Sequence, residues 1–207
     1  MSTPRPYHHG DLRTALLRQA ERTLASHGAD GLSLRELARE VGVSHAAPRR
    51  HFADKQALLD ALAEDGYERL GRRLDAALGG SADVYEDGDF TARLVTFAQA
   101  YVAFAVEHHA LLGLMHTSKD ATRAARLREA NDRAFAAPVA LLAQARARGD
   151  IDADTTGRVD LTVLAVLQGL AVLATTGMNG DGPLEELVSR TVGTLVEGLR
   201  PRESGTT

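Results

Sequence analysis

The chain has 207 residues, with 24 Lys+Arg against 28 Asp+Glu, so its formal charge is −4 and its isoelectric point is about 6.1. It has no Cys, which excludes disulfide-stapled modules, thiolate metal sites and cysteine nucleophiles and favours the cytoplasm. With 44% hydrophobic and 25% charged residues the composition is globular. Taken as a whole, a weakly acidic chain is a poor candidate for nucleic-acid binding, which depends on clustered Lys and Arg.

Hydrophobic periodicity predicts helices along almost the whole chain. Apolar residues recur at spacings of three and four, whereas alternation of apolar and polar residues is scarce. Of the six prolines, only Pro48 and Pro138 interrupt the central part of the chain, so long helices are permitted. We therefore predict an all-α fold. Its first helix is expected over residues 11–27, ended by Gly28.

Two short helices joined by a tight turn are predicted next. Ser33 and Glu36 have the spacing of a capping box, in which each side chain bonds a free backbone N–H at the helix start. Gly42 is expected to end this helix. Ser44 is expected to cap the second short helix, over residues 45–51.

Longer helices are predicted in the rest of the chain. Asp54 is expected to cap a helix that runs to about residue 78, and residues 79–88, rich in Gly, Ser, Asp and Glu, are predicted to be a linker. We expect Pro138 to kink one long helix and Pro183 to occupy the first position of the last helix. The remaining helices are predicted from residue 89 to beyond residue 104 and over residues 110–116, 120–148, 157–176 and 183–199.

Residues 161–180 carry no charged side chain, which meets the length criterion for a membrane helix. Thr, Gln and Asn dilute this segment, Asp160 and Asp181 flank it, and neither end has a Lys/Arg anchor or an aromatic belt. The first ten residues lack the apolar core of an export signal. We therefore expect a helix buried on most sides, in a cytoplasmic protein that does not contact a membrane.

Residues 33–51 have the organisation of a helix-turn-helix, whose second helix lies in the DNA major groove. Other small helical bundles contain such hairpins, but the charge distribution favours DNA. Residues 1–55 carry nine Lys+Arg, six Asp+Glu and five of the eight histidines, a local charge of +3, whereas the remainder has a local charge of −7. This division indicates one end that meets phosphate and one that stays away from it.

The basic residues of this segment are placed to contact DNA. Arg49, Arg50 and His51 are consecutive, which spreads them around the predicted helix, so at least two could reach a groove wall or a base edge. Lys55 follows at the positive N-terminal end of the next helix, where phosphate binding is favoured. For each residue taken singly, an ordinary solvated surface is the alternative.

Four runs within the first 65 residues resemble the DNA-binding domain of the TetR family of bacterial transcriptional regulators. They are LSLRELA at 32–38, VGVS at 41–44, RHF at 50–52 and DKQALL at 54–59. The resemblance implies an all-α homodimer with a three-helix DNA-binding head. It also implies a fourth helix that links this head to a larger helical body, and a pocket for a small-molecule inducer in that body.

The resemblance implies roles for individual head residues as well. Arg35 and residues 45–47 match positions that often face bases, and Arg49, His51 and Lys55 match positions that usually hold phosphates. The residues that we expect to bind DNA are Arg35, Ser44, His45, Ala46, Ala47, Arg49, Arg50, His51 and Lys55.

The head departs from the family pattern at two positions. Arg49 matches a position that is most often a Tyr contacting the DNA backbone, and an Arg would keep the attraction to phosphate but change its geometry. Pro48 lies where its missing N–H could forfeit an intrahelical bond, so the second helix is expected to be short or distorted. Because Ala46 and Ala47 offer only apolar contacts, base discrimination is expected to depend on Arg35, His45 and Arg50.

Residues 101–109 and 114–116 resemble the regulatory half of one TetR subgroup. That subgroup often has a Trp and a His before a Gly in its penultimate long helix, where this chain has Leu164, Gln168 and Gly169. Aromatic walls with a few polar groups are typical of a ligand pocket, although the aromatic residues could simply fill the core. The residues that we expect to bind ligand are Phe97, Tyr101, Phe104, Met115, His116, Asn131 and Gln168.

The last two predicted helices indicate a dimer. Residues 161–174 are apolar nearly all round, and the last helix carries a broad apolar stripe from Leu184 to Leu199. Two such helices pack well as half of a four-helix bundle with a second subunit, with burial inside one subunit as the alternative. A dimer would place two heads on the two half-sites of a palindrome.

Catalytic and metal-binding motifs are lacking. The chain has no nucleophile elbow, phosphate loop, dinucleotide fingerprint or paired-His zinc motif, so we expect neither an enzyme nor a cofactor. The adjacent histidines at 8–9 and 108–109 are poor chelates, because neighbours on a helix point about 100° apart. Asp150, Asp152 and Asp154 imitate a calcium loop without its required Gly and Glu, so no metal site is predicted.

The sequence thus predicts two domains. Residues 1–55 form a DNA-binding head with the helix-turn-helix at about 33–52, and residues 56–207 form a ligand-binding and dimerisation domain. The function that we predict is that of a ligand-responsive homodimeric repressor, which releases a palindromic operator on binding a small molecule. The alternative is a helical small-molecule-binding or interaction protein whose head no longer binds DNA.

Overall fold

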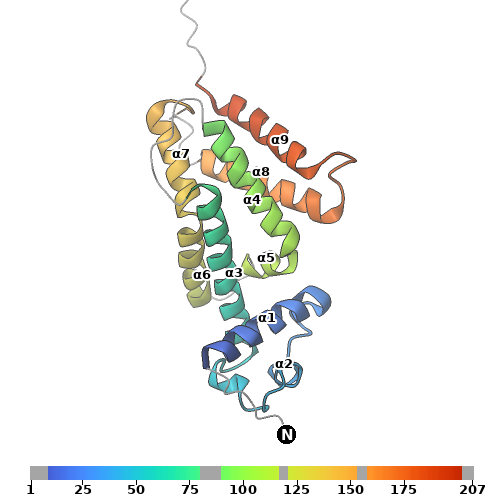
Figure 1. Cartoon of the computed structure of the whole chain (residues 1–207). Coiled ribbons are helices and arrows are strands. Elements are labelled where there is room, and N and C mark those ends of the chain that lie inside the picture. The colour runs from blue at the N-terminus through green and yellow to red at the C-terminus, as the bar shows by residue number, and fades with distance from the viewer. Residues whose placement is uncertain (1–8, 80–89, 117–120, 153–157, 202–207) are drawn as a thin grey trace, which may run out of the picture. The chain divides into compact units, whose positions relative to one another are not determined.

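The computed structural model describes residues 9–79, 90–116, 121–152 and 158–201 of the chain (Figure 1). Within these ranges it has nine α-helices, one short 3-10 helix and no strand, which confirms the all-α prediction. The elements are α1 (His9–His27), α2 (Leu34–Val41), η1 (Pro48–Arg50), α3 (Lys55–Ala77), α4 (Phe90–Glu107), α5 (His109–Met115), α6 (Ala121–Ala134), α7 (Ala136–Arg148), α8 (Arg158–Thr176) and α9 (Leu184–Leu199).

The chain forms two compact units. The head unit comprises Met1–Tyr67 and His108–Ala130, and the body unit comprises Glu68–Glu107 and Asn131–Thr207. Helices α3 and α6 therefore each contribute residues to both units. The functional division after Lys55 stays a prediction. The predicted linker over residues 79–88 lies outside the described residues except for Gly79, and so does Asp154.

In the head unit, α1 packs against α2 and α5, and α2 contacts η1. Leu16, Leu37, Phe52 and Leu58 are buried in its core. Helices α1 and α2 end as predicted, at Gly28 and Gly42, whose φ angles of 68° and 77° lie in the left-handed region that suits glycine.

Two cap predictions for the head have different outcomes. Asp54 caps α3 through a 2.8 Å hydrogen bond from the Ala57 N–H to its Oδ1, as expected. Ser33 does occupy the N-cap of α2 in an extended conformation, but its side chain makes no capping hydrogen bond. The predicted capping box with Glu36 is therefore wrong, and Glu36 instead lies 3.9 Å from the guanidinium of Arg39.

The predicted helix over residues 45–51 is not an α-helix. Residues 45–47 form a turn, in which the Ala47 N–H donates to the carbonyl oxygen of Ser44, and Pro48–Arg50 form the 3-10 helix η1. The helix cap expected at Ser44 is thus wrong, and the residue before η1 is Ala47. An α-helix from residue 45 would need the Pro48 N–H to bond the carbonyl of Ser44, and proline has none. Pro48 instead sits at the start of η1, where no N–H is needed.

In the body unit, α4 is the central helix and contacts α7, α8 and α9. Its inward face buries the aromatic residues Phe97, Tyr101 and Phe104, each at most 2% exposed. The apolar stripe of α9 packs here through Val188, Val192 and Val196. Pro183 lies at the N-cap of α9 rather than at its first position, one residue from the prediction.

The long helix predicted over residues 120–148 is two helices, with the break at Phe135 between α6 and α7. The Phe135 N–H still bonds the carbonyl of Asn131, and the Val139 N–H bonds the carbonyl of Phe135. Pro138 has no N–H to donate to the carbonyl of Ala134, so the series of helical backbone hydrogen bonds is interrupted one turn before the proline. Helix α7 then begins with Pro138 in its first turn.

Within the described residues, α8 is the one helix long and apolar enough to cross a membrane, with a hydropathy of 1.8. It packs against α4 and α9 through Val163, Leu167 and Leu170. Only 28% of the 18-residue apolar stretch within α8 is buried. The expectation of a helix buried on most sides is therefore wrong for a single subunit.

Candidate DNA-contact surface and ligand pocket

The head residues predicted to bind DNA fall mainly on an exposed surface. Arg35 is exposed on α2, and His45, Ala46, Arg49 and Arg50 are exposed around the turn and η1. Ser44 is exposed as well, Ala47, His51 and Lys55 are partly buried, and Pro48 is buried. These nine predicted residues are called the candidate DNA-contact surface below.

Pro48 and Phe52 hold this surface from behind. Both are buried, and the N–H groups of His51 and Phe52 bond the carbonyl oxygen of Pro48 at 3.0 and 2.9 Å. The guanidinium of Arg13 in α1 lies 4.9 Å from the centroid of the Phe52 ring, within the range of a cation–π contact. The segment is thus packed on its apolar side and open on its basic side.

Lys55 has a structural partner in addition to its predicted role. Its Nζ donates a 3.0 Å hydrogen bond to the carbonyl oxygen of Asp30, which ties the start of α3 to the loop after α1. An ammonium group has three N–H donors, so this bond leaves donors for a phosphate.

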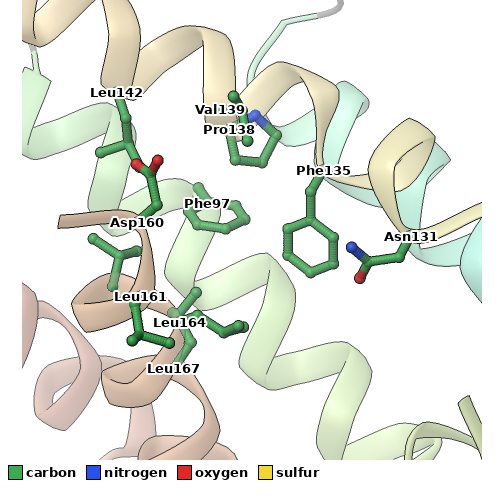
Figure 2. Close-up of a pocket in the computed structure, with 11 residues that line it drawn as sticks. Phe97, Asn131, Phe135, Pro138, Val139, Leu142, Asp160, Leu161, Leu164 and Leu167 are labelled. Atoms are coloured by element: carbon green, nitrogen blue, oxygen red, sulfur yellow. The ribbon is translucent and has the colours of Figure 1, made fainter. Parts of the chain in front are cut away.

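The body unit contains an apolar pocket of about 310 Å³ between α4, α7 and α8 and the end of α6 (Figure 2). This volume is at the lower end of the range for small-molecule sites. The lining residues are Phe97, Asn131, Phe135, Pro138, Val139, Leu142, Asp160, Leu161, Val163, Leu164 and Leu167. Because Val139, Leu161 and Leu164 are also exposed, the mouth of the pocket is apolar.

Two polar side chains mark the ends of the pocket in Figure 2. Asn131 lies beside Phe135, and Asp160 lies toward Leu142. The carboxylate of Asp160 accepts a hydrogen bond from Nη2 of Arg146 in α7, and the two groups form an ion pair. The charge of the one ionisable residue in the lining is therefore balanced.

The predicted ligand residues are not all brought together. Phe97 and Asn131 line the pocket, and Tyr101 lies behind it with its ring centroid 6.1 Å from that of Phe135. Phe104 is buried in the core, and Gln168 is partly buried on α8 without lining the pocket. Met115 and His116 belong to the head unit, where Met115 is buried and His116 is exposed.

Most of the pocket lining was missed from the sequence. Phe135, Pro138, Val139 and Leu142 have the spacing of one helical face, and so do residues 160, 161, 164 and 167. The spacing alone could have grouped each set, but α8 is apolar on so many sides that its sequence does not say which face meets α7.

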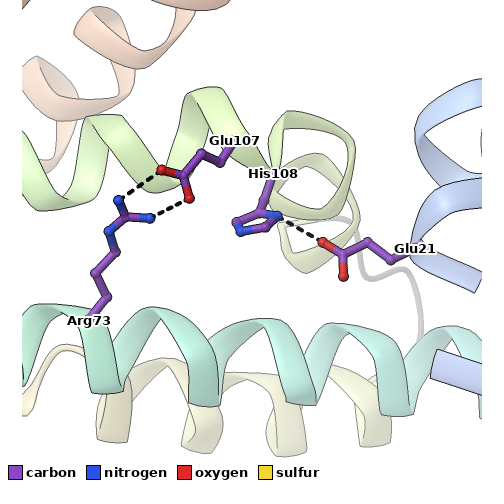
Figure 3. A network of polar contacts seen from close by, with 4 residues as sticks. All are labelled: Glu21, Arg73, Glu107 and His108. Atoms are coloured by element: carbon purple, nitrogen blue, oxygen red, sulfur yellow. Dashed lines mark hydrogen bonds and ion pairs between the residues drawn. The ribbon is translucent and has the colours of Figure 1, made fainter. Parts of the chain in front are cut away.

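Two polar contacts involve the consecutive residues Glu107 and His108, where α4 ends and α5 begins (Figure 3). In the body unit, both guanidinium N–H groups of Arg73 bond the Glu107 carboxylate at 2.7 and 3.0 Å. This hydrogen bonding raises the pKa of Arg73 above its usual value, so the guanidinium stays protonated. In the head unit, Nδ1 of His108 lies 2.8 Å from Oε1 of Glu21.

Among the residues that the structure describes, no group of three or more His, Cys, Asp or Glu side chains could hold a metal ion. The structure combines a helix-turn-helix head that has a basic exposed edge with a helical body that has an apolar pocket. A helix-turn-helix head together with a larger helical body is the organisation of a DNA-binding transcriptional regulator.

The chain belongs to the TetR family of bacterial regulatory proteins. Residues 16–62 match the family model described as bacterial regulatory proteins, tetR family, and residues 94–195 match the one described as tetracyclin repressor-like, C-terminal domain. The resemblance seen in the sequence is thereby confirmed, and the helix-turn-helix lies inside the first match.

The similar proteins include one solved structure of unknown function and two proteins named as a regulator and a repressor. A protein of unknown function from Rhodococcus sp. RHA1 is 42% identical, with a TM-score of 0.81, over 96% of this chain and all of that chain. The regulator Rv1816 of Mycobacterium tuberculosis is 31% identical over 52% of this chain, which spans 44% of that relative. The class C tetracycline repressor of Escherichia coli is 48% identical over 52 residues, 25% of this chain and 24% of that repressor.

Proposed function

We propose that this chain is a ligand-responsive, homodimeric repressor of transcription in the cytoplasm, which binds a palindromic operator and releases it when a small molecule occupies the body pocket. The observation that carries the proposal is the exposure of His45, Arg49 and Arg50 on a segment that buried Pro48 fixes from behind. Polar and basic groups held in this way are suited to base edges and phosphates.

The DNA contacts are divided between two kinds of residue. Arg35, His45 and Arg50 carry hydrogen-bonding groups that distinguish base pairs in the major groove. Arg49, His51 and Lys55 hold phosphates, whose contacts fix the register but carry no sequence information. Ala46 and Ala47 make apolar contacts, for which a thymine methyl group is the matching partner.

The exposed apolar side of α8 supports the homodimer. On the side of α8 outside the pocket lining, Val172 is 53% exposed, and Ala165 and Gly169 are exposed too. In α9, Leu184, Leu187 and Leu195 are only partly buried. Two copies of this helix pair would form a four-helix bundle and cover the apolar area that one subunit leaves open.

Operator release follows from differential binding. A ligand that binds one arrangement of the two heads more tightly than another shifts the population toward it. If the favoured arrangement does not fit both half-sites, ligand binding lowers the affinity for the operator. By thermodynamic linkage, operator binding lowers the affinity for the ligand by the same factor.

A gel-shift assay on the DNA upstream of the gene for this chain tests the proposal. We expect a sequence-preferring complex at low salt that survives an excess of unrelated DNA. The absence of any preference at low salt would contradict the regulator and leave the ligand-binding protein with an inactive head as the remaining function.

A further inference from the structure

Among the described residues, the lining of the body pocket carries no uncompensated charge. Of the eleven residues, Asp160 is the one that ionises, and Arg146 neutralises it from outside the lining. A cationic ligand would have to displace Arg146 from Asp160. An anionic ligand would meet the Asp160 carboxylate, and desolvating either kind of ion in an apolar site costs several kcal/mol.

Asn131 offers the pocket an uncharged polar group. Its Nδ2 donates one long hydrogen bond, 3.4 Å to Oδ1 of Asp132. No group among the described residues donates to its side-chain oxygen Oδ1. A hydroxyl or an amide at this end of the pocket could both donate to that oxygen and accept from the amide.

The shape of the pocket limits the rest of the ligand. The apolar side chains lie between Asn131 at one end and Asp160 at the other (Figure 2). The volume of about 310 Å³ is that of about ten liquid waters, or of an organic molecule with about 10–15 non-hydrogen atoms. The apolar mouth at Val139, Leu161 and Leu164 would cover a chain that extends beyond this volume.

We infer that the pocket binds an uncharged, elongated, apolar molecule with a single hydroxyl or amide group held by Asn131. The inference rests on the proposed ligand-sensing function and narrows it to one chemical class. It also assigns to the Arg146–Asp160 pair a selectivity role, the exclusion of charged molecules of the same length.

Calorimetry on the full chain with three eight-carbon probes tests the ligand class. We expect 1-octanol to bind at least tenfold more tightly than octanoate or octylammonium. Equal or tighter binding of either charged probe, or no binding of any of the three, would overturn the inference.

Two substitutions test the residue roles. Asn131→Leu, which keeps the size of the side chain, is expected to weaken octanol binding three- to tenfold. Asp160→Asn leaves the charge of Arg146 unbalanced and is expected to raise octanoate affinity at least tenfold. Unchanged affinities in both variants, with helical content preserved, would contradict the assigned roles.

The position of the probe can be checked by fluorescence, because the chain has no Trp of its own. Val139→Trp places a reporter at the mouth, and Val106→Trp is the control, since Val106 is exposed on α4 outside the lining. Octanol should shift the emission of the first variant alone. If Val139→Trp instead changes the oligomeric mass, the mouth is a subunit contact and the inference is wrong.

Operator release is measured separately from binding. If octanol binds but leaves the operator complex intact, the proposed regulatory function fails and the ligand class stands. If the operator complex forms and none of the probes binds to the DNA-free protein, the ligand class fails and DNA binding stands.

Discussion

Arg49 and Arg35 differ in what they can recognise, although both are exposed on the head. We expect Arg49→Ala to weaken binding to all DNA sequences and to reduce the salt dependence of log K by about 0.9, the effect of one lost phosphate contact. Arg35→Ala should relax the preference for the operator by about 1–3 kcal/mol at one base pair. Titrations on operator and unrelated DNA at several salt concentrations measure both effects.

Arg39→Ala is the matched control for these two variants. Arg39 is also exposed on α2, within 3.9 Å of Glu36, and is not part of the candidate DNA-contact surface. Like Arg35→Ala and Arg49→Ala, Arg39→Ala removes one positive charge from the head. Affinity and preference that change no more in the Arg35 and Arg49 variants than in this control would show that the assigned roles are wrong.

Gly42 determines the turn of the helix-turn-helix through its backbone. Its φ is 77°, and no atom lies within 4 Å of the position of an added Cβ, so the cost of Gly42→Ala is conformational and not steric. We expect this variant to lower the free energy of unfolding by about 1 kcal/mol. Urea denaturation measures it, and an unchanged midpoint would contradict the expectation.

At the scale of elements, α3 is packed closely against its neighbours at two glycines. In the head unit, a Cβ on Gly66 would come within 2.8 Å of Sδ of Met115, whose carbonyl accepts a hydrogen bond from the Tyr67 hydroxyl. Burial raises the pKa of Tyr67, so this donor stays protonated. In the body unit, a Cβ on Gly71 would come within 3.0 Å of the Ala134 Cα.

Gly71→Ala should therefore destabilise the protein, although alanine is the better helix former by about 1 kcal/mol. The added methyl group meets the backbone of α6, which a rotamer change cannot relieve, so we expect a loss of about 1–3 kcal/mol of unfolding free energy. Thermal and urea denaturation would measure it.

Gly113→Ala is the control for Gly42→Ala and Gly71→Ala. Gly113 lies inside α5 with no atom within 4 Å of an added Cβ, so this variant should be stabilised by up to about 1 kcal/mol. Equal effects of Gly71→Ala and Gly113→Ala would mean that the approach of Ala134 does not limit packing.

The helix ends show how far local sequence predicts this fold. Gly28, Gly42 and Asp54 were correctly assigned, because a left-handed glycine or a capping carboxylate acts within one turn of the chain. The break at Phe135 agrees with the kink predicted before Pro138, because the missing N–H of a proline disrupts the helix in the preceding turn. The capping box predicted at Ser33 is wrong, because the spacing of Ser33 and Glu36 permits the capping hydrogen bonds without requiring them.

The pocket was less predictable than the helices. Aromatic residues on α4 were correctly placed on one buried face, but only Phe97 of the three lines the pocket. Which residues border a cavity depends on how α7 and α8 meet, and this is determined by tertiary packing. The pair of Arg146 and Asp160, fourteen residues apart, has no local sequence signature.

At the scale of the whole molecule, the charge of −4 is an average over two parts of opposite sign. The +3 of residues 1–55 and the −7 of the remainder favour one orientation on DNA, with the head toward the phosphates. The exposed apolar side of α8 belongs to the remainder and not to residues 1–55.

Val172→Glu tests the dimer. Val172 is 53% exposed on α8, and a charge there would be desolvated between two subunits, so we expect a shift from twice the chain mass of 22.1 kDa toward the single chain at micromolar concentration. Val106→Glu, at a 41% exposed position on α4, should leave the mass unchanged. Light scattering gives the mass, and a wild-type chain already at 22.1 kDa would contradict the dimer.

Pro48 is buried and stabilises the fold, whereas the neighbouring residues of the turn are exposed and available for recognition. His45 and Ala46 contribute no side chain to the core, so the protein can accept other residues there at little cost in stability. If the proposed function holds, the operator preference can be reprogrammed at these two positions while the ligand response is retained, which would make the chain a scaffold for building new genetic switches.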